Sequence, residues 1–209
     1  LRTVGGYLQM IQRRYGSKLG VEADEFIGFA IDGSRRMQLL LESLLLYSRV
    51  ATADTAFESV PLAEPLAVAL QNLALLIQET HAQIDVGALP QLRANRVQMV
   101  QLFQNLLSNA IKFAGDRPPR AFVGSRTEGE FHVVFVRDQG IGFDPKFADR
   151  IFKVFRRLRR DTPGTGIGLS ICKKISERHG GHIQAESSPG EGATFSVYFP
   201  IEATTGNPS

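Results

Sequence analysis

The sequence predicts an α+β protein in which a helical hairpin precedes an α/β sandwich with helices on one face of a mixed sheet. Apolar residues recur at helical spacing over residues 1–15 and in a seven-residue rhythm over residues 21–50. Short segments rich in β-branched residues then alternate with further helical segments. We therefore expect two domains and a disordered tail, at residues 1–52, 56–201 and 202–209.

The hairpin is predicted as two helices joined by turn residues at 16–20. Gly28 and the Asp32-Gly33 pair argue against one continuous second helix, because a helical glycine costs about 1 kcal/mol. The apolar stripe nevertheless favours a single helix, and it is too wide for two helices to bury alone. We expect a second copy to complete a four-helix bundle. Packing of the stripe on the chain's own following domain is the alternative.

The second domain should begin after a small polar linker at residues 51–55. Pro65 is tolerated in the first turn of the helix that follows the first strand, and Asn95 is suited to cap a later helix. The predicted strands are 57–60, 83–86, 89–93, 120–126, 130–137, 182–187 and 193–201, and the predicted helices are 62–81, a helix that continues from Asn95 through 101–113, and 168–178.

Composition narrows the possible functions. The chain has 209 residues, a formal net charge of +3 and a pI near 9.2, too mild for a typical nucleic-acid-binding protein, and the basic excess is confined to residues 150–160. A single cysteine, Cys172, excludes an internal disulfide and favours a reducing cytoplasm. No apolar run reaches the roughly 18 residues that span a bilayer, and the N-terminus lacks a signal-peptide pattern, so we expect no membrane contact from this region.

Three polar residues share one side of the helix at residues 101–113. Asn105, Asn109 and Lys112 follow one another at steps of four and three, beside an apolar face. Amide oxygens there can face a hard cation and an ammonium can face phosphate. An ordinary solvated helix face is the alternative for these residues taken alone.

Asp138 follows an apolar strand and begins the segment Asp-Gln-Gly-Ile-Gly. An ionised carboxylate only accepts hydrogen bonds, so it can hold the exocyclic amine of adenine and repels the carbonyl of guanine. Gly140 and Gly142 allow close approach of the backbone to a flat base. An ordinary turn is the alternative reading of this short motif.

A second glycine-rich segment, residues 164–168, leads into the helix at 168–178. Backbone amides at a helix N-terminus bind phosphate. The segment matches neither the Walker loop, which needs Gly-Lys-Ser/Thr, nor the dinucleotide-binding fingerprint.

The order of these motifs resembles the N, G1, F and G2 boxes of sensor histidine kinases. The helix with two asparagines is followed by Asp-x-Gly-x-Gly, then Phe152-Lys-Val-Phe155, then Gly-Thr-Gly-Ile-Gly-Leu. Upstream, Leu1-Arg2 is similar to the end of the family's phosphoacceptor box, and residues 25–50 resemble the second dimerisation helix of phytochrome-type kinases. The resemblance covers nearly the whole chain and implies a histidine-kinase ATP-binding fold.

The resemblance assigns roles to matching residues. It implies that ATP and Mg²⁺ are the cofactors, that Asn109 binds Mg²⁺, that Asn105 supports the metal and phosphates, and that Lys112 neutralises phosphate charge. Those three residues would be catalytic, and residues 143–163 would form a mobile lid whose arginines help to hold the triphosphate. The remaining nucleotide-binding residues would be Phe113, Asp138, Gly140, Gly142, Gly164, Thr165, Gly166, Gly168, Leu169 and Thr194.

The family's phosphoaccepting histidine has no counterpart among the four histidines, which lie in other elements: His81, His132, His179 and His182. We expect it just upstream of Leu1, so that this region binds ATP without phosphorylating itself on the usual residue. His179 and His182 have no third ligand nearby that would make a metal site.

Related ATPases place a water-activating glutamate four residues before the metal-binding asparagine. Asn105 occupies that position, which favours phosphotransfer to histidine over hydrolysis. A phosphatase, or a non-catalytic module that docks a response regulator, is a further alternative. The resemblance implies a response regulator, a second copy of the chain and an upstream sensory or photosensory domain as partners, and no nucleic acid.

Overall fold

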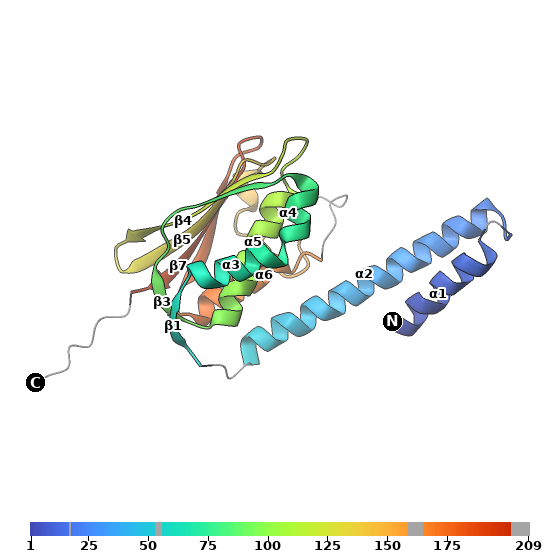
Figure 1. Ribbon diagram of the computed structural model, residues 1–209, viewed down its shortest axis with the longest axis horizontal. Helices are drawn as coiled ribbons and strands as arrows, with labels where there is room; N and C mark the ends of the chain where they lie inside the picture. Colours follow the sequence, from blue (N-terminus) through green and yellow to red (C-terminus); the bar gives the residue numbers. More distant parts are fainter. Residues whose placement is uncertain (17, 53–55, 159–164, 202–209) are drawn as a thin grey trace, which may run out of the picture.

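The structure is a computed structural model that describes residues 1–16, 18–52, 56–158 and 165–201. Figure 1 shows a pair of helices that leads into a domain in which helices are stacked against one side of a sheet. The α+β class predicted from the sequence is therefore confirmed. The tail at 202–209 lies outside the described residues.

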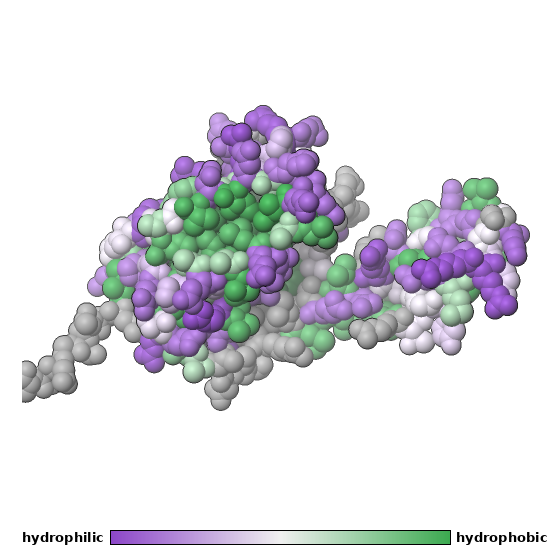
Figure 2. Space-filling model, in the orientation of Figure 1, coloured by the Kyte–Doolittle hydropathy of each residue, from purple (hydrophilic) through white to green (hydrophobic). Residues whose placement is uncertain are grey.

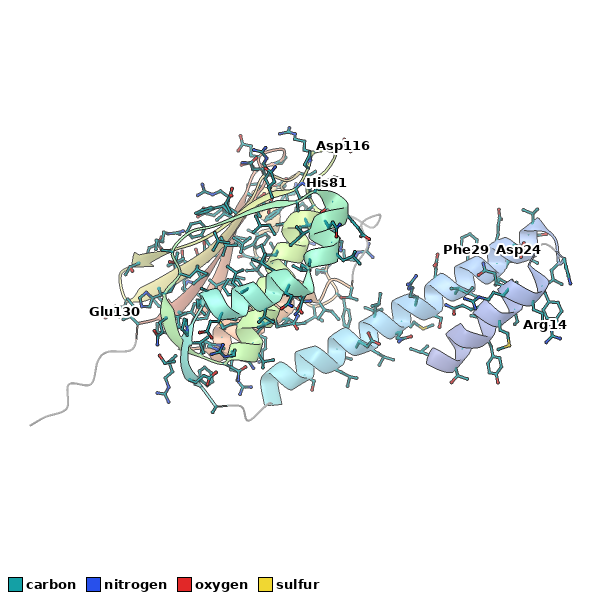
Figure 3. The ribbon with its side chains drawn as sticks, viewed as in Figure 1. Arg14, Asp24, Phe29, His81, Asp116 and Glu130 are labelled. Carbon is teal, nitrogen blue, oxygen red and sulfur yellow. The ribbon has the colours of Figure 1, made fainter. Side chains whose placement is uncertain are left out.

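The hairpin consists of α1 (Arg2–Tyr15) and α2 (Val21–Thr52). Gly28 and Gly33 do not interrupt α2, which begins with Glu22 and Asp24 in its first turn, where negative charge complements the helix dipole. The two helices pack closely, and the buried Ser34 hydroxyl donates a hydrogen bond to the Leu1 carbonyl oxygen at 3.4 Å. Met37, Leu41 and Leu44 of the predicted stripe remain exposed on the single chain. Phe29, which lies outside that stripe, is also exposed and projects from α2 in Figure 3.

The main sheet has five strands in the order β2-β4-β5-β7-β6. β2 pairs with β4 in parallel and the other neighbours are antiparallel, so the sheet is mixed. The bounds of these strands are Gln83–Val86 for β2, Arg120–Glu128 for β4, Phe131–Asp138 for β5, His182–Ser187 for β6 and Ala193–Pro200 for β7. The turn between β4 and β5 carries Glu130 at one end of the sheet (Figure 3).

Two short strands form a separate sheet. β1 (Glu58–Pro61) pairs antiparallel with β3 (Gln91–Ala94). The two neighbouring strands predicted at 83–86 and 89–93 thus belong to different sheets, because the chain between β2 and β3 leaves the main sheet to meet β1.

The predicted helix at 62–81 is two helices in the structure, α3 (Ala63–Asn72) and α4 (Ala74–Thr80). The break falls at Leu73, which stays in the core while α4 changes direction and has no fully buried residue. Figure 2 shows apolar side chains gathered over these two helices, where Leu75 is 68% exposed. Helical periodicity continues across the break, which is why the sequence pattern did not reveal it.

The remaining helices are α5 (Arg96–Lys112) and α6 (Gly168–Arg178). Asn95 caps α5 as predicted, with its side-chain oxygen accepting a hydrogen bond from the Gln98 backbone N–H at 3.0 Å. The apolar face of α5 is buried between the sheet and the neighbouring helices, and each large side chain there contributes about 1.5–3 kcal/mol through burial. Its buried apolar residues are Met99, Leu102, Phe103, Leu106, Leu107, Ala110 and Ile111.

The hairpin also touches the second domain. α2 contacts α6, and Leu40 packs against the core of that domain. This contact covers part of the apolar stripe of α2, which is the arrangement expected if the stripe packs on the chain's own second domain. Apolar residues of α1 and of the part of α2 beside it remain exposed. Among the helices of the described ranges, none combines the length and the hydropathy that crossing a membrane requires.

Candidate functional site

A cavity of about 430 Å³ lies where the end of α5, the end of β5 and the start of α6 meet. Its size suits a ligand as large as a nucleotide. Nine of the residues predicted as site residues line it: Asn109, Lys112, Phe113, Asp138, Gly142, Thr165, Gly166, Gly168 and Leu169. Asn105, Gly140 and Thr194 are not among the lining residues, and Gly164 lies outside the described residues.

Asp138 provides a buried carboxylate at the cavity wall and is 7% exposed. Its Oδ1 accepts hydrogen bonds from the backbone N–H groups of Gly140 at 2.9 Å and Ala193 at 3.1 Å. Burial raises the pKa of Asp138 above its ordinary value, and the two backbone hydrogen bonds oppose this shift. Because both bonds go to Oδ1, Oδ2 is the oxygen available to a ligand.

Gly142 and Gly166 shape the cavity through their backbone. Gly142 has a φ of +58°, and a Cβ there would overlap the Ser188 carbonyl oxygen. Gly166 has a φ of +72° and packs against the backbone of Phe155 and Arg156. L-residues rarely adopt such φ values, so both positions require glycine. Gly140 packs instead against the Phe113 carbonyl, behind the cavity wall.

Among the described residues, three cations line the cavity: Lys112, Arg156 and Arg157. Burial lowers the pKa of Lys112 from its ordinary value, and the nearby positive charge of Arg157 lowers it further. Two like charges held near each other in a partly dehydrated wall favour an anionic ligand, which would relieve the repulsion. Arg159 and Arg160 lie outside the described residues.

The two asparagines of α5 occupy different positions. Asn109 lines the cavity. Asn105 lies toward the start of α6, where its Oδ1 accepts a hydrogen bond from Gln101 Nε2 at 3.3 Å and its Nδ2 is buried. Burial raises the pKa of the nearby Cys172 thiol to about 12, with the Asn105 amide acting in the opposite direction, so this cysteine is an inert core residue.

Sequence reasoning selected Thr194, but its neighbour Ala193 lines the cavity and donates its N–H to Asp138. Alternation along β7 explains the difference, since successive side chains point to opposite faces of a sheet. Thr194 pairs with Arg137 of β5 and Glu186 of β6 and borders a second hollow, which Asp138 and Ala193 also line. Only the pairing of β7 with its neighbouring strands shows which of these two adjacent residues faces the cavity.

The apolar wall of the cavity was also missed. It is formed by Ile141, Phe143, Phe147, Ile151, Leu158, Pro189 and Phe195. Several of these residues belong to the predicted lid, residues 143–163, of which positions 159–163 lie outside the described residues. The segment opens with a short 3₁₀ helix, η1 (Pro145–Phe147), capped by Asp144, which accepts a hydrogen bond from the Lys146 N–H at 3.0 Å. The mobility of the lid stays a prediction.

The described lining combines three kinds of group with different chemistry. It contains one carboxylate, several apolar side chains, and three cations together with the N-terminus of α6, whose first amides have no partner within the helix. A ligand with a flat base that donates hydrogen bonds and with a phosphate chain matches all three kinds of group.

Comparisons with known proteins agree with this chemistry. Residues 94–203 match the model of the histidine kinase-, DNA gyrase B-, and HSP90-like ATPase family. The phytochrome-like protein Cph1 of Synechocystis sp. is 43% identical over 203 residues, which are 96% of this chain and 27% of that protein. Cyanobacterial phytochrome A of Nostoc sp. is 45% identical over 203 residues, 96% of this chain and 26% of that protein. This chain thus spans about a quarter of the length of these relatives.

A solved structure shares the fold across both domains. Histidine kinase ThkA, in its complex with the response regulator protein TrrA, superposes with a TM-score of 0.66 at 21% identity, over 95% of this chain and 57% of that chain. The likeness covers the hairpin as well as the sandwich, so the order of the two domains is common to both proteins.

The chain belongs to the histidine kinase-, DNA gyrase B- and HSP90-like ATPase family, whose domain binds ATP. More particularly, it is a region of the histidine-kinase type that is similar to the corresponding parts of phytochrome-like proteins.

Proposed function

We propose that the cavity binds Mg²⁺-ATP and that the intact protein transfers the γ-phosphate to a histidine upstream of Leu1. The observation that carries this proposal is the cavity itself, which joins the Asp138 carboxylate of β5 to Asn109 and Lys112 of α5. Adenine would donate its amine to Asp138 Oδ2, and the base would lie against the apolar wall. The triphosphate would extend toward Lys112, Arg157 and the first amides of α6.

The residues present fit a magnesium ion. Asn109 offers an amide oxygen at the phosphate end, and Mg²⁺ in such sites is commonly held by few protein ligands together with phosphates and waters. When bound, the ion would neutralise charge that develops on the phosphates. Lys112 and Arg157 would bind the same phosphates and hold them in one orientation. Because Asn105 faces α6 and not the cavity, we assign it support of this wall and no direct contact with the metal.

Transfer to a histidine is favoured over hydrolysis of ATP. Among the described residues that line the cavity, Asp138 is the only acid, and we assign it to the base. The position that would supply a water-activating glutamate holds Asn105, which cannot take a proton. Within the part of the chain that the structure describes, the wall therefore suits the positioning of a phosphate donor and offers no further acid to activate water.

The partners follow from the hairpin and from the relatives. Exposed apolar residues along both hairpin helices suit a second copy of the chain in a four-helix bundle; they include Val4, Tyr7, Met10, Phe26, Phe29, Leu41, Leu44 and Leu45. The complex of ThkA with a response regulator supports a response regulator as the next phosphate acceptor. Similarity to phytochromes supports a photosensory domain upstream, and we place the reaction in the cytoplasm.

The direct test measures ligand-dependent stability. Millimolar Mg²⁺-ATP should raise the melting temperature of this region, and GTP should not. Asp138→Asn should abolish the shift, because the amide would turn its NH₂ toward the adenine amine while its oxygen accepts from Gly140 and Ala193. The matched control is Asp85→Asn, at an exposed position on β2. An equal shift in the Asp138 variant would reject the assignment of the base.

A further inference from the structure

The hydrogen-bond partners of the two ring nitrogens of His179 determine which nitrogen carries the proton. Nδ1 lies 2.8 Å from the Ile175 carbonyl oxygen, and Nε2 lies 3.1 Å from the backbone nitrogen of Asn95. A carbonyl oxygen can only accept and a backbone N–H can only donate. The ring is therefore neutral, with its proton on Nδ1.

These two hydrogen bonds join the helices that carry the proposed ATP site. Asn95 is the cap of α5, is 4% exposed, and so depends on His179 for the partner of its own N–H. His179 follows the last turn of α6, whose first turn lines the cavity. One side chain thus connects the beginning of α5 to the end of α6, each at the end of its helix away from the cavity.

The same ring also contacts the place where the chain enters the domain. Phe57, just before β1, lies with its ring centroid 4.7 Å from that of His179. Phe199 of β7 meets the ring edge-on at 5.8 Å. The segment that follows α2 therefore packs on His179, which is hydrogen-bonded both to the cap of α5 and within α6.

We propose that His179 is a positioning residue that couples nucleotide binding between α5 and α6 to the entry segment at residues 57–60. Binding that makes the two helices more rigid would restrict Phe57 through this ring, and a displacement of the entry segment would in turn act on the helix ends. The inference rests on the proposed function, since it assumes that ATP occupies the cavity.

The surroundings of the ring keep it neutral. Burial lowers the pKa of His179, the positive charge of Arg178 lowers it further, and the Ile175 carbonyl opposes both. Among the described residues that adjoin the partners of the ring, Glu58 of β1 and Arg96 at the start of α5 form an ion pair, Arg93 lies on β3, and β7 contributes the neutral Phe199. Protonation would turn Nε2 into a second donor facing the Asn95 N–H, so it would break the connection to α5.

Amide hydrogen exchange with and without Mg²⁺-ATP tests the coupling. In the wild-type region ATP should slow exchange in α5, in α6 and at residues 57–60. His179→Gln keeps an acceptor for the Asn95 N–H but loses the ring, and His179→Phe keeps the ring but loses both hydrogen bonds. Both variants should still show slower exchange in α5 and α6 with ATP and no response at residues 57–60. Without ATP, exchange at Asn95 should be roughly tenfold faster in His179→Phe than in His179→Gln, as expected when a buried N–H loses its partner.

An undiminished response at residues 57–60 in both variants would overturn the coupling, as would its absence in a wild-type region whose α5 and α6 do respond. If ATP changes exchange nowhere, the proposed function fails instead.

The nitrogen chemical shifts of the His179 ring, measured by NMR on the wild-type protein, provide an independent test. These should report the Nδ1–H tautomer at neutral pH, and the Nε2–H tautomer would overturn the inference. As the pH is lowered and His179 is protonated, exchange at Asn95 should accelerate relative to its intrinsic rate.

Discussion

Asp138 Oδ1 accepts the backbone N–H of Ala193 at 3.1 Å, across 55 residues of sequence. This hydrogen bond joins the end of β5 to the start of β7 directly beneath the cavity, and it orients the carboxylate so that Oδ2 remains available. The acid that would select the base is thus held by backbone groups whose positions the sheet determines.

Nucleotide affinity should depend on the ionisation of Asp138. Burial raises the pKa of this acid above 3.8, so protonation begins at a higher pH than for an exposed aspartate. The protonated acid resembles asparagine, and we expect wild-type ADP affinity to exceed that of Asp138→Asn by about 10- to 100-fold at pH 7.5. The ratio should fall toward one as the pH falls through the raised pKa. Calorimetry on both proteins measures this ratio of affinities. Protonation of the nucleotide affects both proteins equally and cancels in the ratio. A ratio that does not depend on pH would contradict the role of the carboxylate.

Lys112→Met should weaken the binding of ATP more than the binding of adenosine, because the ammonium group interacts with the phosphates. Lys112 is partly buried beside Arg157, so we expect a loss of roughly tenfold for ATP, the size of one charge-assisted hydrogen bond, and little change for adenosine. Lys173→Met on the exposed face of α6, where the lysine is paired with Glu177, is the control. Fluorescence competition with both ligands gives the comparison. Equal losses for ATP and adenosine would place Lys112 away from the phosphates.

Gly142→Ala should destabilise the domain by about 1–3 kcal/mol. The residue has a φ of +58°, and the added methyl group would meet the Ser188 carbonyl oxygen. Gly129→Ala is a close control, since Gly129 has a φ of +55° with no atom near its missing Cβ. Urea denaturation of the two variants separates steric overlap from conformational strain, because only the strain is common to both. A smaller loss for Gly142→Ala than for Gly129→Ala would contradict the packing described around the cavity.

Stability should fall in mildly acidic solution because of His179. Its folded-state pKa lies below the ordinary value of 6.5, so below pH 6.5 the unfolded chain binds a proton that the folded chain does not. The contribution of neutral His179 is therefore fully present above about pH 6.5 and decreases as the pH falls toward the folded-state pKa. Urea denaturation at pH 7.5 and 5.5 should show a larger loss in the wild-type protein than in His179→Gln. The opposite order would mean that the ring is charged in the folded state.

Phe29→Glu should convert a dimer into a monomer. Phe29 is 67% exposed on α2 of the single chain, and a charge there would be buried between copies. Leu75→Glu on α4 is matched in exposure, at 68%, and lies outside the hairpin. Light scattering should report a dimer for the wild-type protein and for Leu75→Glu. A wild-type monomer at high concentration would remove the basis for the four-helix bundle.

Several site residues were accessible from the sequence because their spacing has a direct physical meaning. Asn109 and Lys112 share a helix face whose opposite side is apolar, and the glycines around Asp138 and before α6 indicate close backbone approach. Asn105 lies at the same periodicity but faces α6, since the rotation of α5 about its axis is determined by the packing of its neighbours. The break at Leu73 and the pairing of β3 with β1 were missed for a related reason. Neither the break nor the pairing changes the local periodicity of apolar residues.

By itself, the sequence determined the class of the protein, and it predicted the order of the domains and the residue types of a nucleotide site, because these depend on local periodicity and on motifs along the chain. Only the tertiary structure decided that Ala193 and not Thr194 meets Asp138, which cations lie together, and that His179 joins α5, α6 and the entry segment. Strand register and helix rotation decide those contacts, and both result from packing between segments far apart in the chain.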